Sequence, residues 1–180
     1  MKILPSNSTL LIIDVQERLL PKIHQNEDVI KNVLWAVDLA QTIGIPNLLT
    51  EHCPHKIGPT PTELRDKFKE KDILTKVYFS AVREGNLLDK IQKERKQIII
   101  AGTEAHICVQ QTVLDLLEKD YQVFILDSAV GTRFPNDKER ALERMSKNGA
   151  EIITPDMLAF EWLEKAETPL FKEVLNKFIK

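Results

Sequence analysis

Short, uninterrupted apolar runs alternate along this chain with segments of helical periodicity. The clearest runs lie at residues 9–14 and 96–101, and each contains four consecutive apolar residues. Such runs are typical of strands that are buried on both faces, as in a parallel sheet covered by helices on each side. The alternation therefore predicts an α/β fold, in which ligands bind beyond the carboxyl ends of the strands.

The same periodicities place the strands and helices in turn. Strands are predicted at residues 9–14, 46–50, 73–77, 96–101, 122–127 and 151–153. Helices are predicted at residues 26–44, 62–71, 86–95, 105–119, 135–149 and 156–165, and a last helix opens at Thr168 and Pro169. No repeat or flexible linker interrupts the pattern, so residues 1–180 are interpreted as a single domain.

Composition argues against several classes of function. The chain has 25 basic and 27 acidic residues, without the basic excess of a nucleic-acid-binding protein. No apolar run approaches the roughly 20 residues of a membrane span, and the first residues lack the apolar region of a signal peptide. Two cysteines, Cys53 and Cys108, are therefore expected to be reduced. We expect a cytoplasmic protein that acts on a small molecule and binds neither nucleic acid nor membrane.

An acid, a base and a thiol follow the predicted strands. Asp14 ends the first strand, Lys76 ends the third, and Cys108 opens the helix after the fourth. The dipole at a helix start favours an anion, which predicts a lowered pKa for the Cys108 thiol. Asp14 would then serve as general base, and backbone N–H groups would hold an oxyanion. Each residue also has a structural interpretation: a turn former, a solvated lysine and a small buried apolar side chain.

Further candidates line the same edge of the sheet. Gln16, Glu51, His52 and Phe79 lie just past strand ends and are interpreted as substrate contacts, although Phe79 fits a core position equally well. His52, Cys53 and His55 are the cluster with ligand-type side chains, but three irregularly spaced donors are few for a zinc site. His106 lies two residues before Cys108, so the two do not face each other on a helix; it contacts substrate or another chain, or is exposed.

The last predicted helix carries a wide apolar stripe. Its members are Leu170, Phe171, Val174, Leu175, Phe178 and Ile179. Such a stripe packs on the chain's own core or covers a subunit interface. We expect a homo-oligomer, a dimer or larger.

Three segments together resemble the isochorismatase-like cysteine hydrolase family, which includes nicotinamidases and related amidohydrolases. They are residues 9–16, 74–81 and 102–112, the last matching a Gly-x-x-x-x-x-Cys-Val-x-x-Thr turn. Residues 50–54, 58–60 and 169–174 are similar to the branch of isochorismatase domain-containing proteins. The resemblance covers about residues 8–180. It implies a three-layer α/β/α sandwich around a parallel sheet of about six strands.

The resemblance also implies roles for individual residues. Asp14, Lys76 and Cys108 correspond to the catalytic residues, and the backbone N–H groups of Glu104 and Cys108 to the oxyanion donors. The Thr103–Glu104 peptide bond is expected to be cis. The Asp-x-His motif with which nicotinamidases hold a metal is missing, and His52 and Cys53 stand where the branch has Gln and Tyr. No metal or other cofactor is therefore expected.

The function implied is cysteine-dependent hydrolysis of the C–N bond of a small amide through a thioester. One alternative is hydrolysis of the vinyl ether of an isochorismate-like acid, although family members with that activity can dispense with the thiol. The other alternative is a binding or scaffold protein that keeps the fold without turnover.

Overall fold

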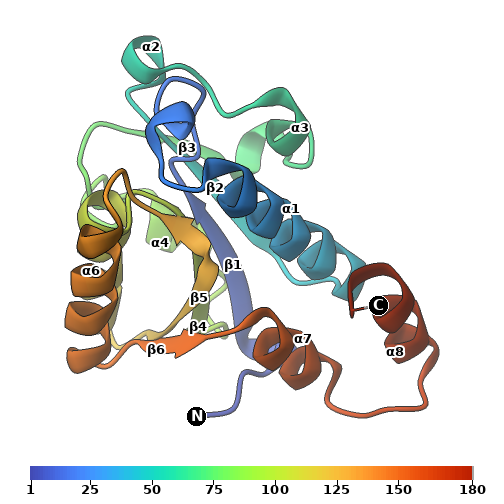
Figure 1. Ribbon diagram of the computed structural model, residues 1–180. Coiled ribbons are helices and arrows are strands. Elements are labelled where there is room, and N and C mark those ends of the chain that lie inside the picture. Colours follow the sequence, from blue (N-terminus) through green and yellow to red (C-terminus); the bar gives the residue numbers. More distant parts are fainter. Residues whose placement is uncertain (180) are drawn as a thin grey trace.

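A computed structural model describes residues 1–179 and places six strands in one sheet (Figure 1). The strands are β1 (Ser8–Ile13), β2 (Asn47–His52), β3 (Ile73–Lys76), β4 (Gln97–Thr103), β5 (Gln122–Gly131) and β6 (Glu151–Ile153). Their order across the sheet is β3-β2-β1-β4-β5-β6, and every neighbouring pair is parallel. The predicted α/β class and the parallel sheet are confirmed.

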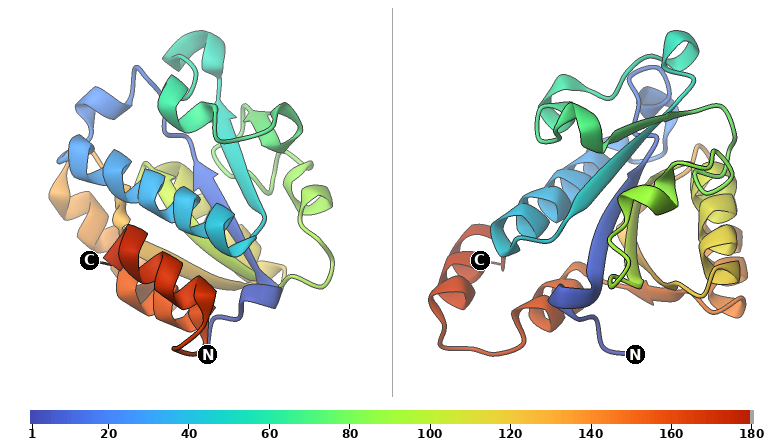
Figure 2. Two further views of the ribbon diagram at one scale, coloured as in Figure 1. Left: turned by 90° about the vertical axis from the view of Figure 1, so that its right-hand side faces the viewer. Right: turned by 180° about the vertical axis from the view of Figure 1, so that it is seen from behind.

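Helices cover both faces of the sheet, as Figures 1 and 2 show. One layer consists of α1 (Asn26–Ile43), α7 (Pro155–Leu163) and α8 (Pro169–Val174), and the other of α4 (Leu87–Lys90), α5 (Gln110–Glu118) and α6 (Pro135–Lys147). Short helices α2 (Pro54–Ile57) and α3 (Thr62–Arg65) follow β2. Single turns complete the chain at η1 (Pro5–Asn7), η2 (Leu20–Lys22), η3 (Glu70–Asp72), η4 (Ala105–Val109) and η5 (Leu175–Ile179). Each layer encloses its own apolar core against the sheet, which confirms the three-layer sandwich.

Helix α1 shows how the sequence builds one of these layers. Val29, Val33 and Val37 recur at helical spacing, and all three are buried against the sheet. Gly44 ends the helix with a φ of 88°, and its N–H binds the carbonyl of Ala40. Glycine adopts this left-handed conformation without the steric penalty of other residues.

Four predicted elements differ from the structure. The helix predicted at 62–71 has one turn, α3, which ends at Arg65. The helix predicted at 86–95 also has one turn, because Ile91 takes an extended conformation with a φ of −82° and a ψ of 126°. Strand β5 runs four residues past its predicted end, since a register shift lets its last part pair with the end of β4. The helix predicted at 105–119 begins as the wide π-type turn η4, and α5 starts at Gln110.

The apolar stripe at the end of the chain packs on the chain's own core. Val174 is fully buried, and Phe171 and Phe178 pack against the cluster that contains α1. The indole N–H of Trp35 donates to the carbonyl of Phe178 over 3.1 Å, and the two rings meet edge to face. The stripe is thus occupied within one chain and does not itself indicate an interface.

The strand order reverses between β1 and β4, which is where doubly wound sheets open a crevice for ligands. Ile13 and Gly102 are opposite each other at the end of these strands. A Cβ atom on Gly102 would lie 2.0 Å from the Ile13 carbonyl oxygen, and the φ of Gly102 is 126°. The residues that follow both strands are thereby held side by side at this crevice. Within residues 1–179, no helix is both long and apolar enough to cross a lipid bilayer.

Candidate active site

Asp14 lies at the crevice immediately after β1 and is 1% exposed. Its backbone has a φ of 49°, and its carbonyl accepts a hydrogen bond of 2.7 Å from the Thr103 hydroxyl. One carboxylate oxygen accepts from the Thr50 hydroxyl, and the other from the Lys76 ammonium, each over 2.6 Å. The carboxylate is therefore fixed from β2 and β3, next to the turn that carries Cys108.

Lys76 ends β3, two strands away from β1, and its side chain is 1% exposed. Besides Asp14, its ammonium group binds the carbonyls of Tyr78 and Phe79 over 3.1 and 2.9 Å. Three acceptors match the three N–H bonds of the ammonium group. Burying this charge is tolerated because it is paired and its donors are used.

Cys108 lies in the wide turn η4 and is 7% exposed. Burial raises the pKa of its thiol far above the usual range, Asp14 raises it further, and Lys76 acts in the opposite direction. The expected lowering of this pKa by the helix start is wrong, because exclusion from water and a carboxylate neighbour outweigh the helix dipole. Burial next to Asp14 therefore favours the neutral form of the thiol beside a candidate base.

A small cavity of about 130 Å³ opens onto this thiol. Its lining residues are Asp14, Leu19, His52, Ile57, Phe79, Glu104, Ile107 and Cys108. Aliphatic and aromatic side chains form half of this wall, and no lysine or arginine is among these lining residues. The volume corresponds to about four water molecules. The cavity suits a small, uncharged group.

His52 and Phe79 both line the cavity, as predicted for substrate contacts. Their rings stack with centroids 5.4 Å apart. Phe79 is 51% exposed, so it is not a core residue. Burial, and next the charge of Lys76, lower the pKa of His52, so its imidazole is neutral at pH 7.

Gln16 and Glu51, which were interpreted as substrate contacts, are not among the lining residues of this cavity. The Gln16 amide accepts from the N–H of His52 over 2.7 Å and donates to the carbonyls of His52 and Gly58. Glu51 accepts from the backbone N–H of Thr60 and pairs with a nearby arginine. Both polar side chains bind backbone groups of the loop after β2, so they help to shape that loop.

Glu104 joins β4 to the turn that carries Cys108, and the Thr103–Glu104 peptide bond is cis, as the resemblance implies. Its buried carboxylate accepts from the Arg133 guanidinium over 2.8 Å and from the Arg133 backbone N–H over 3.1 Å. The sequence contained no signal for this pair, because Arg133 follows the part of β5 that was not predicted. His106 lies between the carboxylates of Glu104 and Asp137, at 3.7 and 3.6 Å, and is not a lining residue of the cavity.

The metal-type cluster considered at His52, Cys53 and His55 does not form. Cys53 precedes α2 with a φ of 40°, and His55 is exposed. His52 instead lies with Asp14, which follows β1, and with Cys108 in η4. One ligand atom from each of these three residues lies within 4.8 Å of the other two.

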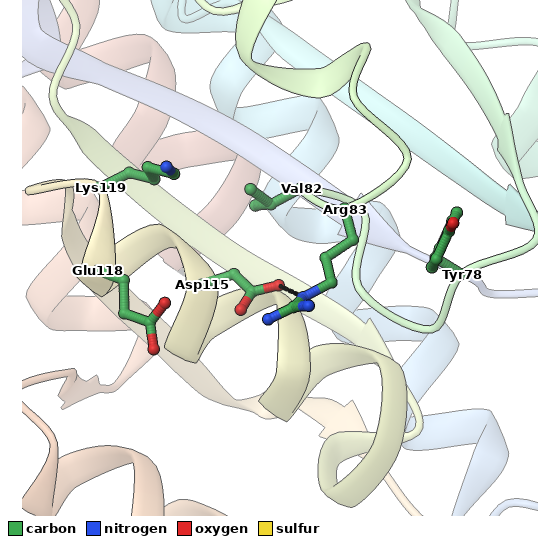
Figure 3. Close-up of a pocket in the computed structure, with 6 residues that line it drawn as sticks. All are labelled: Tyr78, Val82, Arg83, Asp115, Glu118 and Lys119. Carbon is green, nitrogen blue, oxygen red and sulfur yellow. Dashed lines mark hydrogen bonds and ion pairs between the residues drawn. The ribbon is translucent and has the colours of Figure 1, made fainter.

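A second hollow, of about 400 Å³, lies on the surface and shares no lining residue with this cavity (Figure 3). It is lined by Tyr78, Val82, Arg83, Asp115, Glu118 and Lys119. The Asp115 carboxylate accepts from Arg83 and from the Ser80 hydroxyl, over 3.2 and 2.6 Å. These bonds attach the segment after Phe79 to α5, which indicates a structural role for this hollow.

Comparison with known proteins decides the family. Residues 8–157 match the family model of the isochorismatase domain. The chain belongs to the isochorismatase family. Isochorismatase domain-containing protein 2 of Danio rerio is 33% identical over 168 residues, which cover 93% of this chain and 84% of that protein. As a member of this family, the protein is a hydrolase.

Solved structures of isochorismatase-like proteins share the fold. The MAR1 ribonuclease of Caenorhabditis elegans superposes with a TM-score of 0.93 at 32% identity, covering 99% of this chain and 92% of that one. YcaC of Escherichia coli, described as an octameric hydrolase of unknown specificity, superposes with a TM-score of 0.91 at 24% identity, covering 99% and 91%. At that identity, the likeness to YcaC shows the fold alone.

Proposed function

We propose that this isochorismatase-family hydrolase cleaves the C–N bond of a small, uncharged amide with Cys108 as nucleophile. The observation that carries the proposal is the buried cluster of Asp14, Lys76 and Cys108 beside a small cavity. A thiol, a base within reach and a group that orients the base are the parts that nucleophilic catalysis needs.

The first half of the reaction forms a thioester. Asp14 takes the proton of the Cys108 thiol as the sulfur attacks the carbonyl carbon of the amide. The backbone N–H groups of Glu104 and Cys108 hold the oxyanion that develops, as an oxyanion hole does. Asp14 then returns the proton to the leaving nitrogen, and the C–N bond breaks. Lys76 orients Asp14, because its ammonium group binds one carboxylate oxygen.

The second half of the reaction releases the acid. Asp14, again ionised, takes a proton from a water molecule that attacks the thioester carbonyl. The C–S bond breaks, and the proton returns to the Cys108 sulfur. A neutral resting thiol suits this cycle, because the proton that Asp14 needs for the leaving group comes from Cys108 itself.

Two other activities fit the cavity less well. An isochorismate-like acid and an RNA strand, the substrate that the name of the Caenorhabditis elegans relative suggests, are both anionic. Lys76 and Arg133 bind the lining residues Asp14 and Glu104, so the charge of each is already paired with a carboxylate. A buried anion without a free cation is costly. A neutral amide avoids this cost.

We also propose that the chain works in the cytoplasm as a homo-oligomer without a metal cofactor. The octameric state described for YcaC supports assembly. Because the last helix packs on its own core, the interface would use other apolar surface. Val77 and Tyr78, next to the site, are 62% and 55% exposed and fit such a contact.

A panel of small primary amides with ammonia detection tests the reaction. Turnover should disappear in Cys108→Ser and persist in Cys53→Ser, the matched control at the second cysteine. Dialysis against a strong chelator should leave the rate unchanged. Retained turnover in Cys108→Ser, or hydrolysis of RNA or a vinyl ether in place of every amide, would contradict the proposal.

A further inference from the structure

We propose that Asp14, His52 and Cys108 form a binding site for a soft divalent cation such as Zn²⁺, and that its binding reversibly switches the nucleophile off. The three residues come from separate parts of the fold. Asp14 follows β1, His52 ends β2, and Cys108 lies in η4. Their ligand atoms lie within 4.8 Å of one another, at the wall of the cavity.

The donor set matches the chemistry of zinc. A thiolate, an imidazole and a carboxylate are all established zinc ligands, and three of them leave a fourth position for water. The cavity of about 130 Å³ has room for that water. The three donors must draw closer together than 4.8 Å to reach a tetrahedral ion.

His52 is held ready for this role. Its backbone is bound on both sides by the Gln16 amide, and its ring stacks on Phe79. The Nδ1 atom of His52 is buried and has no hydrogen-bond partner within residues 1–179. A ring fixed in place is favourable for a ligand, because little ordering is required on binding.

Charge balance makes the binding reversible. The cation replaces the thiol proton: the S–H bond breaks, a bond from sulfur to the metal forms, and the proton leaves to solvent. The Cys108 thiolate then offsets one charge of the ion, and the ion shares the Asp14 carboxylate with Lys76. Lys76 keeps its bonds to two backbone carbonyls, but its charge repels the ion and weakens binding. With its electron pair on the metal, the sulfur no longer attacks a carbonyl.

Cobalt titration tests the site without any substrate. Bound Co²⁺ gives a thiolate-to-metal absorption band in the near ultraviolet, which should appear in the native protein. The band should vanish in Cys108→Ser, and binding should weaken about tenfold or more in His52→Gln. Cys53→Ser and His55→Gln are matched controls, because both residues adjoin His52 in sequence but lie outside the cluster. Far-ultraviolet circular dichroism checks that each variant is folded.

Alkylation gives a second test within one sample. Zn²⁺ should slow the reaction of iodoacetamide with Cys108 but not with Cys53, as read by peptide mass spectrometry. Equal alkylation of Cys108 with and without Zn²⁺ would overturn the proposal, as would a cobalt band that depends on Cys53 or is unchanged in His52→Gln. Zn²⁺ that accelerates amide hydrolysis would also overturn it. Because both readouts omit substrate, this proposal and the proposed reaction fail independently.

Discussion

Lys76→Met is the substitution whose effect on stability the structure defines most sharply. Methionine keeps most of the length of the side chain but removes the ammonium group. Asp14 is then left with the Thr50 hydroxyl as its side-chain partner and with an uncompensated charge in the interior. We therefore expect a large loss in the free energy of unfolding at pH 7.

The magnitude follows from burial. The Lys76–Asp14 pair is separated by 2.6 Å, and each side chain is 1% exposed. Removing one partner of a buried pair costs about 3–5 kcal/mol. Lys67 and Asp38 form a matched control: the same residue types lie 2.6 Å apart, but their side chains are 30% and 41% exposed. Solvent screening reduces the contribution of that pair to the free energy of unfolding to about 0.2–1 kcal/mol.

Urea unfolding, monitored by circular dichroism, measures the loss in the free energy of unfolding for both pairs. Lys76→Met and Lys67→Met should differ by about 2 kcal/mol or more, with similar dependence on urea concentration. The double variant Asp14→Asn with Lys76→Met should be less destabilised than the sum of its single variants, because each single variant leaves a buried charge unpaired and the double variant leaves none. Equal losses in the two methionine variants would refute the buried pair, and additive losses would refute the coupling.

Three further predictions follow from the same geometry. Gly102→Ala should lower the free energy of unfolding by about 3 kcal/mol or more, because the new Cβ would meet the Ile13 carbonyl. Gly85→Ala, with open space around it, should cost less, and equal losses on thermal unfolding would contradict this. Because the pKa of Cys108 is raised, alkylation of Cys108 in the resting enzyme should be slower than that of free cysteine at pH 7.5. The rate of alkylation should increase as the pH rises above 9. Fast labelling at neutral pH would show a resting thiolate. Light scattering at micromolar concentration should report a mass above the 20.7 kDa of one chain, and a 20.7 kDa species would exclude the oligomer.

Local pattern predicted the fold class and most strands of this protein, and it singled out the residues that follow the strand ends. Apolar runs such as residues 10–13 and 98–101 are buried on both faces, as their composition predicts. Asp14, Lys76 and Cys108 follow strand ends, and the parallel direction of the sheet brings those ends to one edge. Periodicity and the ends of runs are properties of neighbouring residues, so the sequence expresses them directly.

Tertiary structure decided how these residues act on one another. The strand order places β1 between β2 and β4, and it lets Lys76 reach Asp14 from β3, two strands away. The same order brings a ligand atom of His52 within 4.8 Å of Cys108, in a cluster that does not include Cys53 or His55. The tertiary structure also places the Gln16 amide where it accepts a hydrogen bond from the backbone N–H of His52. The pKa of Cys108 rises because residues distant in sequence exclude water from it. Strand order, burial and pairing depend on contacts between remote segments, which no local pattern encodes.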